Sequence, residues 1–222
     1  MSSLIYRHRA AYHLLMRLLY GRYFSARYEA IAAEVPAGSR VVDVCAGDGY
    51  LYLHYLRAKS VQYQALDISP RLVQWMQRHG IQAQQFDVWQ DTLPSADIVI
   101  MQASLYQFLP DAAPIVEKML CAARQQVIVT EPIRNIASSD NPLLRFVGQR
   151  LTRPEKGGGA YQARRFDRDS LMALFQRFPA FEQSHELPGG REMLIVLRLP
   201  FHNALDGDDL GRVVAAAQEF RV

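Results

Sequence analysis

The stretch Val41-Val42-Asp43-Val44-Cys45-Ala46-Gly47-Asp48-Gly49-Tyr50 decides the fold of this chain. In it, an apolar run ends in a turn of small residues, and a segment with helical character follows. Asp67 closes a second apolar run at residues 63–67, and Asp87 closes a weaker one at residues 83–87. Ligands of open parallel sheets bind outside the C-terminal ends of the strands. Three strand-like segments, each with a carboxylate near its C-terminal end, therefore predict one edge of a nucleotide-type pocket.

The turn after the first predicted strand favours a ligand without phosphates. Small residues let the backbone approach the ligand, and the next helix points its first N–H groups into the same crevice. A dinucleotide site would require G-x-G-x-x-G. Here Tyr52 stands at the third glycine position, and Asp48 puts a negative charge where a pyrophosphate would bind. Asp67 lies 24 positions after Asp43, a spacing that suits a carboxylate accepting ribose hydroxyls.

These motifs together resemble those of the class I S-adenosylmethionine-dependent methyltransferases. Residues 43–49 resemble the first motif of that family, D-x-G-x-G-x-G, with Cys45 at the first glycine position. Asp67 resembles the ribose-binding acid and Asp87 the adenine-contacting acid, while residues 96–108 resemble the fourth strand and the segment after it. The resemblance implies an α/β fold with a Rossmann-like, seven-stranded, mostly parallel sheet. It also implies an N-terminal helical extension and an antiparallel last strand pair.

The resemblance also assigns residues to a cofactor and to an acceptor. S-adenosylmethionine, which combines adenine, ribose and a sulfonium with an amino-acid tail, is the implied cofactor. The residues expected to bind it are Asp43, Cys45, Ala46, Gly47, Gly49, Asp67, Ile68, Asp87, Val88 and Gln102. The residues expected to contact the acceptor are Tyr20, Tyr106, Gln107 and Glu131. Holding both partners in near-attack geometry supplies much of the acceleration of such a displacement, so a conspicuous catalytic dyad is not required.

The acceptor-side residues have competing interpretations. Glu131 is a candidate catalytic base or amine ligand, and the alternative is a loop carboxylate that pairs with Arg134. Tyr106 is the second catalytic candidate, and its alternative is packing under the adenosine. Tyr20 belongs to an N-terminal segment rich in tyrosine and arginine. That segment is interpreted as a lid that also packs on the sheet, with a membrane-surface helix as the rival.

Hydrophobic periodicity and turn residues predict the order of elements. We expect strands at residues 40–45, 63–67, 83–87, 97–101, 126–130, 181–187 and 192–199. We expect helices at residues 4–34, 50–58, 69–80, 112–123, 142–151, 169–178 and 208–220. The expected organisation is a helical cap at 1–38, a cofactor-binding domain at 39–200 with a substrate-side insertion at 133–168, and a helical tail at 201–222.

Length, cysteine content and charge indicate the size of the domain and the cellular compartment. A chain of 222 residues suits one α/β domain with a full core. Cys45 and Cys121 are the only cysteines; we expect no disulfide and a reducing, cytoplasmic location. No apolar run is long enough for a transmembrane segment, and no signal peptide pattern is present. Basic residues gather in residues 1–40 and 134–168. Such patches can attract an anionic partner, but a solvated face is the favoured explanation for either patch alone.

Several acceptors are disfavoured by absent motifs. Residues 102–104 are Gln-Ala-Ser, where amino-methylating DNA enzymes of the resembling families carry an Asn/Asp-Pro-Pro-aromatic segment. Neither cysteine lies where carbon-5 methylation of pyrimidines requires one. No cluster has metal-ligand spacing, so no metal is expected, and no nucleic-acid module is present. The prediction is O- or N-methylation of a small molecule, an anionic one included. A non-catalytic S-adenosylmethionine-binding partner and an aminopropyltransferase-like enzyme are the alternatives, and no feature indicates an oligomeric state.

Overall fold

A computed structural model describes residues 17, 20–134 and 165–200. The strands are β1 (Arg40–Val44), β2 (Gln62–Asp67), β3 (Ala83–Gln85), β4 (Ala96–Gln102), β5 (Ala123–Pro132), β6 (Phe181–Glu186) and β7 (Glu192–Arg198). The α-helices are α2 (Ala26–Glu34), α3 (Pro70–Arg78), α4 (Ala113–Ala122) and α6 (Arg168–Phe175). The predicted helices at 142–151 and 208–220, and about half of the one at 4–34, lie outside the described residues.

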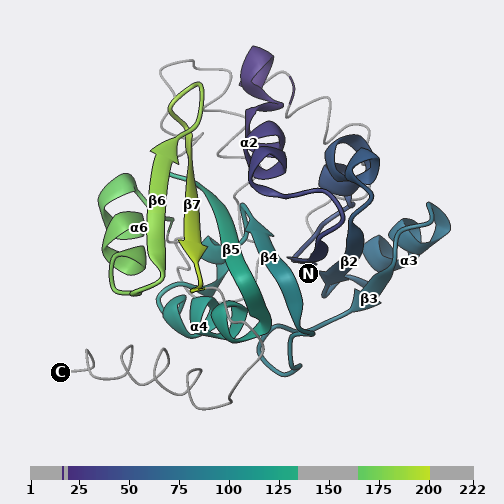
Figure 1. Ribbon diagram of the computed structural model, residues 1–222. Coiled ribbons are helices and arrows are strands. Elements are labelled where there is room, and N and C mark those ends of the chain that lie inside the picture. Colours follow the sequence, from purple (N-terminus) through teal and green to yellow (C-terminus); the bar gives the residue numbers. More distant parts are fainter. Residues whose placement is uncertain (1–16, 18–19, 135–164, 201–222) are drawn as a thin grey trace, which may run out of the picture.

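One seven-stranded sheet in the order β3-β2-β1-β4-β5-β7-β6 organises the described chain (Figure 1). The pairs among β3, β2, β1, β4 and β5 are parallel, whereas β7 runs antiparallel to both β5 and β6. The order reverses at β1, where the chain goes first outward to β3 and then returns to β4. This reversal is the point at which open α/β sheets bind ligands. The predicted fold, with its mostly parallel sheet and antiparallel last strand pair, is confirmed.

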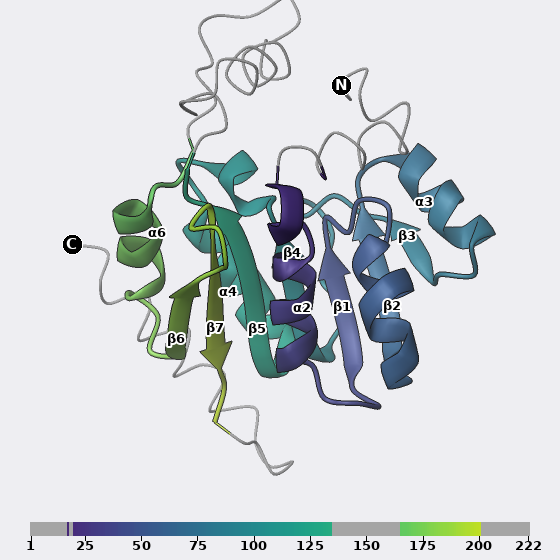
Figure 2. The same ribbon diagram turned by 90° about the horizontal axis from the view of Figure 1, so that it is seen from above.

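Helices cover both faces of the sheet (Figure 2). On one face α2 and α3 pack through Ile31, Val73 and Met76 against a core cluster that includes the sheet residues Val41 and Ile100. On the other face α4 and α6 pack against the alternate residues of the same strands. That second cluster includes Val42, Val99, Ile115, Met119 and Phe175. Strands buried on both faces explain the continuous apolar runs of the sequence.

The helix boundaries follow local chemistry. The Ser69 hydroxyl accepts a hydrogen bond from Leu72 N, and Pro70 occupies the first turn of α3, where the missing N–H is no loss. Gly80 follows that helix with φ +73°. Asp167 and Ser170 form a reciprocal capping box at the start of α6. These starts and stops agree with those predicted from the sequence.

Several predicted boundaries differ from the observed ones: helix α6 ends at Phe175 instead of residue 178, β5 begins at Ala123 instead of residue 126, and three further differences have a clear physical reason. The helix expected at 50–58 contains the π-helix η3 (Tyr52–Leu56) and a 3₁₀ turn at Arg57–Lys59, which apolar spacing over so few residues cannot distinguish from an α-helix. Strand β3 ends at Gln85 instead of Asp87, because the Asp87 side chain accepts a hydrogen bond from Trp89 N and starts a local turn. Strand β5 continues to Pro132 because β7 pairs with it to its end.

Candidate functional site

The turn between β1 and η3 has an unusual backbone. Cys45, Gly47 and Gly49 adopt φ values of +58°, +63° and +68°, in the left-handed region that costs an L-residue energy. Ala46 N donates to Leu66 O at 3.0 Å, and Gly47 N donates to Asp67 Oδ2 at 2.9 Å. The turn is thereby bonded to the end of β2. This fixes its backbone across the carboxyl ends of two neighbouring strands.

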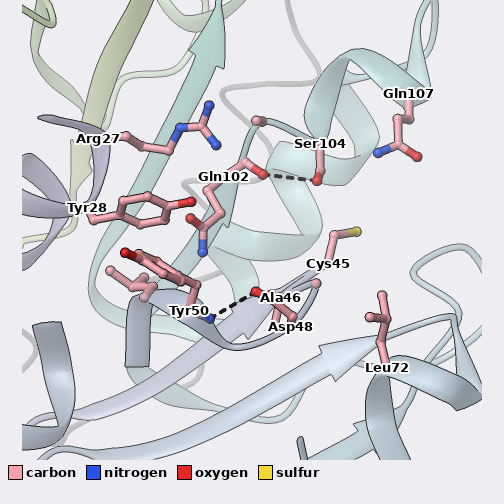
Figure 3. Close-up of a pocket in the computed structure, with 13 residues that line it drawn as sticks. Arg27, Tyr28, Cys45, Ala46, Asp48, Tyr50, Leu72, Gln102, Ser104 and Gln107 are labelled. Carbon is pink, nitrogen blue, oxygen red and sulfur yellow. Dashed lines mark hydrogen bonds between the residues drawn. The ribbon is translucent and has the colours of Figure 1, made fainter. Parts of the chain in front are cut away.

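A pocket opens over this turn (Figure 3). It is bounded by the turn, by α2, by the start of α3 and by the segment that follows β4. Its lining residues are Arg27, Tyr28, Cys45, Ala46, Gly47, Asp48, Tyr50, Leu51, Leu72, Gln102, Ala103, Ser104 and Gln107. Arg27 and Tyr28 lie at one end and Leu72 at the other. The pocket therefore has a polar end under α2 and an apolar end beside α3.

Two carboxylates lie behind the turn. Asp43 is fully buried, and its Oδ2 accepts hydrogen bonds from Tyr63 Oη at 2.6 Å and Gln102 Nε2 at 3.1 Å. Its Oδ1 has no hydrogen-bond partner among the described residues. Asp67 accepts from Gly47 N and from Ser69 N, each at 2.9 Å. Burial is the largest influence on both groups; it raises the pKa of Asp43 to about 7 and raises that of Asp67.

The raised pKa of Asp43 predicts a pH-dependent stability. The pKa of an ordinary aspartate is 3.8, and that of Asp43 in the folded protein is about 7. The folded state therefore holds this proton more tightly than the unfolded state does. The contribution of Asp43 to stability falls as pH rises from about 4 to 7. Asp43→Asn removes that contribution, on the order of a few kcal/mol. Urea unfolding between pH 4.5 and 8 should give a flatter stability profile for the variant. Parallel profiles for the variant and the unmodified protein would contradict the assignment to Asp43.

Glu131 lies inside β5 and not in a loop, because β7 extends the pairing to its neighbour Pro132. Its side chain is fully buried, and Oε1 accepts from Ser104 N at 2.7 Å and Leu105 N at 2.6 Å. These amides begin the 3₁₀ helix η5 (Leu105–Phe108), so Glu131 holds the segment that carries Ser104 and Gln107 to the pocket. Burial raises its pKa to about 7 despite those amides. The alternative interpretation, a loop carboxylate that pairs with Arg134, does not match these observed partners.

The polar end of the pocket is formed by Arg27 and Tyr28 of α2, and Glu192 of β7 holds the Arg27 side chain. Arg27 Nε donates to Glu192 Oε2 at 2.9 Å, and Arg27 Nη2 also donates to Glu192 Oε1. Burial opposes the charged form of Arg27, but Glu192 outweighs it and the pKa of the guanidinium is raised. Tyr28 packs beside Tyr50, with ring centroids 4.8 Å apart and the ring planes tilted by 48°. The predicted lid segment thus contributes directly to the pocket, through Arg27 and Tyr28.

The predicted site residues fall into three groups. Cys45, Ala46, Gly47, Gln102 and Gln107 line the pocket. Asp43, Asp67 and Glu131 are buried behind it, and Gly49 packs against Met76 and Ile81. Outside it lie Tyr106, under the Arg165 guanidinium, and Tyr20, beside a smaller hollow near the β6–β7 turn. Ile68 follows β2, whereas Asp87 and Val88 follow β3, and none of the three lines the pocket.

The structure adds lining residues that the sequence reasoning missed. Arg27, Leu72 and Ser104 line the pocket but were not among the expected site residues. Leu72 could have been found from its place in the first turn of the helix after Asp67. Arg27 carries no such signal, because the helix that positions it precedes the first strand.

The described residues contain no further obvious chemical centre. Within them, no group of three or more His, Cys, Asp or Glu side chains could hold a metal ion. The helices in the described ranges include none long and apolar enough to cross a membrane. Cys45 and Cys121 are both unpaired, as expected. Burial raises the pKa of the Cys45 thiol to about 12, so this thiol in the pocket is protonated and is a poor nucleophile near neutral pH.

Several solved structures that share this fold are methyltransferases. Magnesium protoporphyrin IX methyltransferase from Synechocystis PCC 6803, with bound SAH, is 13% identical with a TM-score of 0.59, and the match covers 88% of this chain and 97% of that one. A methyltransferase from Thermotoga maritima is 16% identical (TM-score 0.60; 87% and 97% covered). Human N-acetylserotonin methyltransferase in complex with SAM is 18% identical (TM-score 0.58; 87% and 57% covered). The fold is therefore that of the class I methyltransferases.

A comparison of the sequence with protein-family models identifies one family. Residues 25–135 match the family described as methionine biosynthesis protein MetW. The matched stretch is half of the 222 residues and includes β1 to β5 with the turn at residues 45–49. The chain therefore belongs to the MetW family. No curated protein matches the sequence closely enough to add a relative.

Proposed function

We propose that this protein binds S-adenosylmethionine and transfers its methyl group to a small-molecule acceptor. The observation that carries the proposal is the left-handed turn at residues 45–49, bonded to Asp67 and open to a pocket at the strand-order reversal. None of the five residues in this turn is basic. Asp48 lines the pocket, which disfavours a phosphate-bearing ligand and suits one that carries a positive charge.

The residues present fit this cofactor. A Cβ at Gly47 would meet no atom within 4 Å, so the backbone there is open to close approach by a ligand. Asp43 Oδ1 is a buried acceptor without a partner in the described chain. We assign Asp67 to the ribose hydroxyls and Gly47 with Gln102 to the methionine portion. Ile68, whose side chain is 63% exposed, would contact the adenine together with Asp87 and Val88.

The bound cofactor would supply an activated methyl group on a positively charged sulfur. The protein would position the acceptor against it, which can contribute about 7–11 kcal/mol in favourable systems. Ser104 and Gln107 offer hydrogen-bonding groups to the acceptor, and Tyr28 and Tyr50 offer aromatic surface. Glu131 already accepts two backbone N–H bonds, so we propose that it positions the η5 segment instead of acting as the base. Tyr106 and Tyr20 would meet only an acceptor that extends beyond the pocket.

Replacing Asp67 tests the cofactor assignment. Asp67→Ala removes the acceptor for two ribose hydroxyls and for Gly47 N, and binding of S-adenosylhomocysteine should weaken roughly 10–100-fold. Calorimetry measures this on protein whose folding is checked by circular dichroism. Asp97→Ala is the matched control. Asp97 accepts a hydrogen bond from Arg40 N at the N-terminal ends of β1 and β4, on the side of the sheet away from the pocket. Equal affinities for both folded variants would refute the ribose assignment.

The proposed function itself is tested by binding and turnover. We would titrate the protein with S-adenosylmethionine, S-adenosylhomocysteine and NAD, expecting micromolar binding of the first two only. Incubation of methyl-labelled S-adenosylmethionine with a metabolite library should then transfer label to an acceptor. Binding without transfer to any acceptor would favour a non-catalytic role in the MetW family. NAD binding alone would overturn the proposal.

A further inference from the structure

Arg27 is a buried cation with unused hydrogen-bonding capacity. A guanidinium has five N–H donors in a planar fork. The two hydrogen bonds to Glu192 use the Nε donor and one Nη2 donor, which leaves three donors. The Arg27 side chain is only 12% exposed and lines the pocket. Its remaining donors therefore face a space with little access to bulk water, where a ligand is the natural partner.

The surroundings of Arg27 select the kind of ligand group. Glu192 is 5% exposed and fixes the guanidinium from the side of β7. Tyr28 and Gln102 lie at the same end of the pocket (Figure 3). A guanidinium held in one orientation matches a carboxylate, because its parallel N–H groups can bind both oxygens.

The cofactor places a carboxylate at this end. In the proposed function the adenosine lies toward Asp67 and Leu72, so the amino-acid tail extends along the turn toward α2. Arg27 and Leu72 occupy opposite ends of the pocket (Figure 3). We propose that Arg27, oriented by Glu192, binds the α-carboxylate of S-adenosylmethionine. This inference rests on the proposed function and assigns one end of the same site.

The test compares two ligands that differ in the amino-acid tail. S-adenosylhomocysteine carries the α-carboxylate, and 5′-methylthioadenosine lacks the whole tail beyond the thioether. The variant Arg27→Gln alone would leave Glu192 buried without a counterion, which is costly for folding. The double variant Arg27→Gln/Glu192→Gln replaces the pair by two neutral amides of similar size. Arg198→Gln is the control, because Arg198 pairs with Glu182 and Glu34 away from the pocket.

Calorimetry on the folded proteins separates the outcomes. We expect the double variant to lose on the order of 10–100-fold in affinity for S-adenosylhomocysteine and less than about 3-fold for 5′-methylthioadenosine. Arg198→Gln should bind both ligands as the unmodified protein does. Unchanged affinity of the double variant for S-adenosylhomocysteine, or equal losses for both ligands, would overturn the role of Arg27. If the unmodified protein binds neither ligand, the proposed function fails instead.

Discussion

Gly49→Ala is expected to lower the free energy of unfolding by about 2–5 kcal/mol. Gly49 has φ +68°, and a left-handed backbone costs an L-residue about 1–2 kcal/mol. A Cβ there would also lie 2.5 Å from Ile81 Cδ1 and 3.3 Å from Met76 Sδ. Both neighbours are buried, so their displacement disturbs the core and adds about 1–3 kcal/mol. Urea-induced unfolding of the variant and the unmodified protein measures the difference.

Gly47→Ala is the matched control for this effect. Gly47 has a similar φ of +63°, but its Cβ would meet no atom within 4 Å. The expected loss of stability is therefore about 1–2 kcal/mol, from the backbone term alone. The added methyl group would project into the space assigned to the cofactor, so binding of S-adenosylhomocysteine should suffer more than stability does. Equal destabilisation of the two variants would show that the packing against Ile81 contributes nothing.

Glu131→Ala is expected to destabilise the protein by about 2–5 kcal/mol. The substitution leaves Ser104 N and Leu105 N without their acceptor, and both residues are buried. Each unsatisfied buried donor costs about 1–3 kcal/mol. The segment that lines the pocket after β4 should also lose its position, so binding of S-adenosylhomocysteine weakens. Thermal unfolding and calorimetry measure the two effects.

Glu131→Gln distinguishes a positioning role from a catalytic one. The amide oxygen of glutamine still accepts the two backbone hydrogen bonds, so the variant should lose no stability at neutral pH. It should even gain stability there, because burial raises the pKa of Glu131 to about 7 and the amide removes the cost of ionising that carboxyl group. Methyl transfer should persist once an acceptor is known, because no proton acceptor has been removed from the reaction. A stable Glu131→Gln protein that binds S-adenosylhomocysteine normally but has lost turnover would restore Glu131 as the base.

The sequence was most predictive where local chemistry determines structure. Asp43 and Asp67 lie near the C-terminal ends of β1 and β2. They could be predicted because a polar residue that interrupts an apolar run marks the place where a buried strand reaches the ligand-binding side of the sheet. The start of α3 at Ser69-Pro70 and the turn at 188–190 between β6 and β7 were predicted from residues that satisfy helix caps or turns. Strand β3 was placed less well, because only three residues pair before the Asp87 turn begins.

Features that depend on distant partners could not be predicted. The end of β5 is determined by β7, and this pairing places Glu131 inside the sheet. Tyr50 was expected only as the first residue of a helix, yet it lies in the pocket wall against Tyr28. Arg27 lies in the pocket because α2 packs on the sheet in a particular orientation. No short sequence motif indicates that orientation. The polar end of the site is therefore a property of the tertiary structure.

The ion pair between Arg27 and Glu192 also constrains the order in which the site is completed. The two residues are 165 positions apart, and β7 lies between β5 and β6 in the sheet. During synthesis, α2 and the first five strands leave the ribosome well before β7. Until then one edge of β5 is unpaired and Arg27 lacks its counterion, and an unpaired edge is a place where nascent chains aggregate. The ion pair at the end of the pocket under α2 therefore forms late, only after the chain has been translated past residue 192.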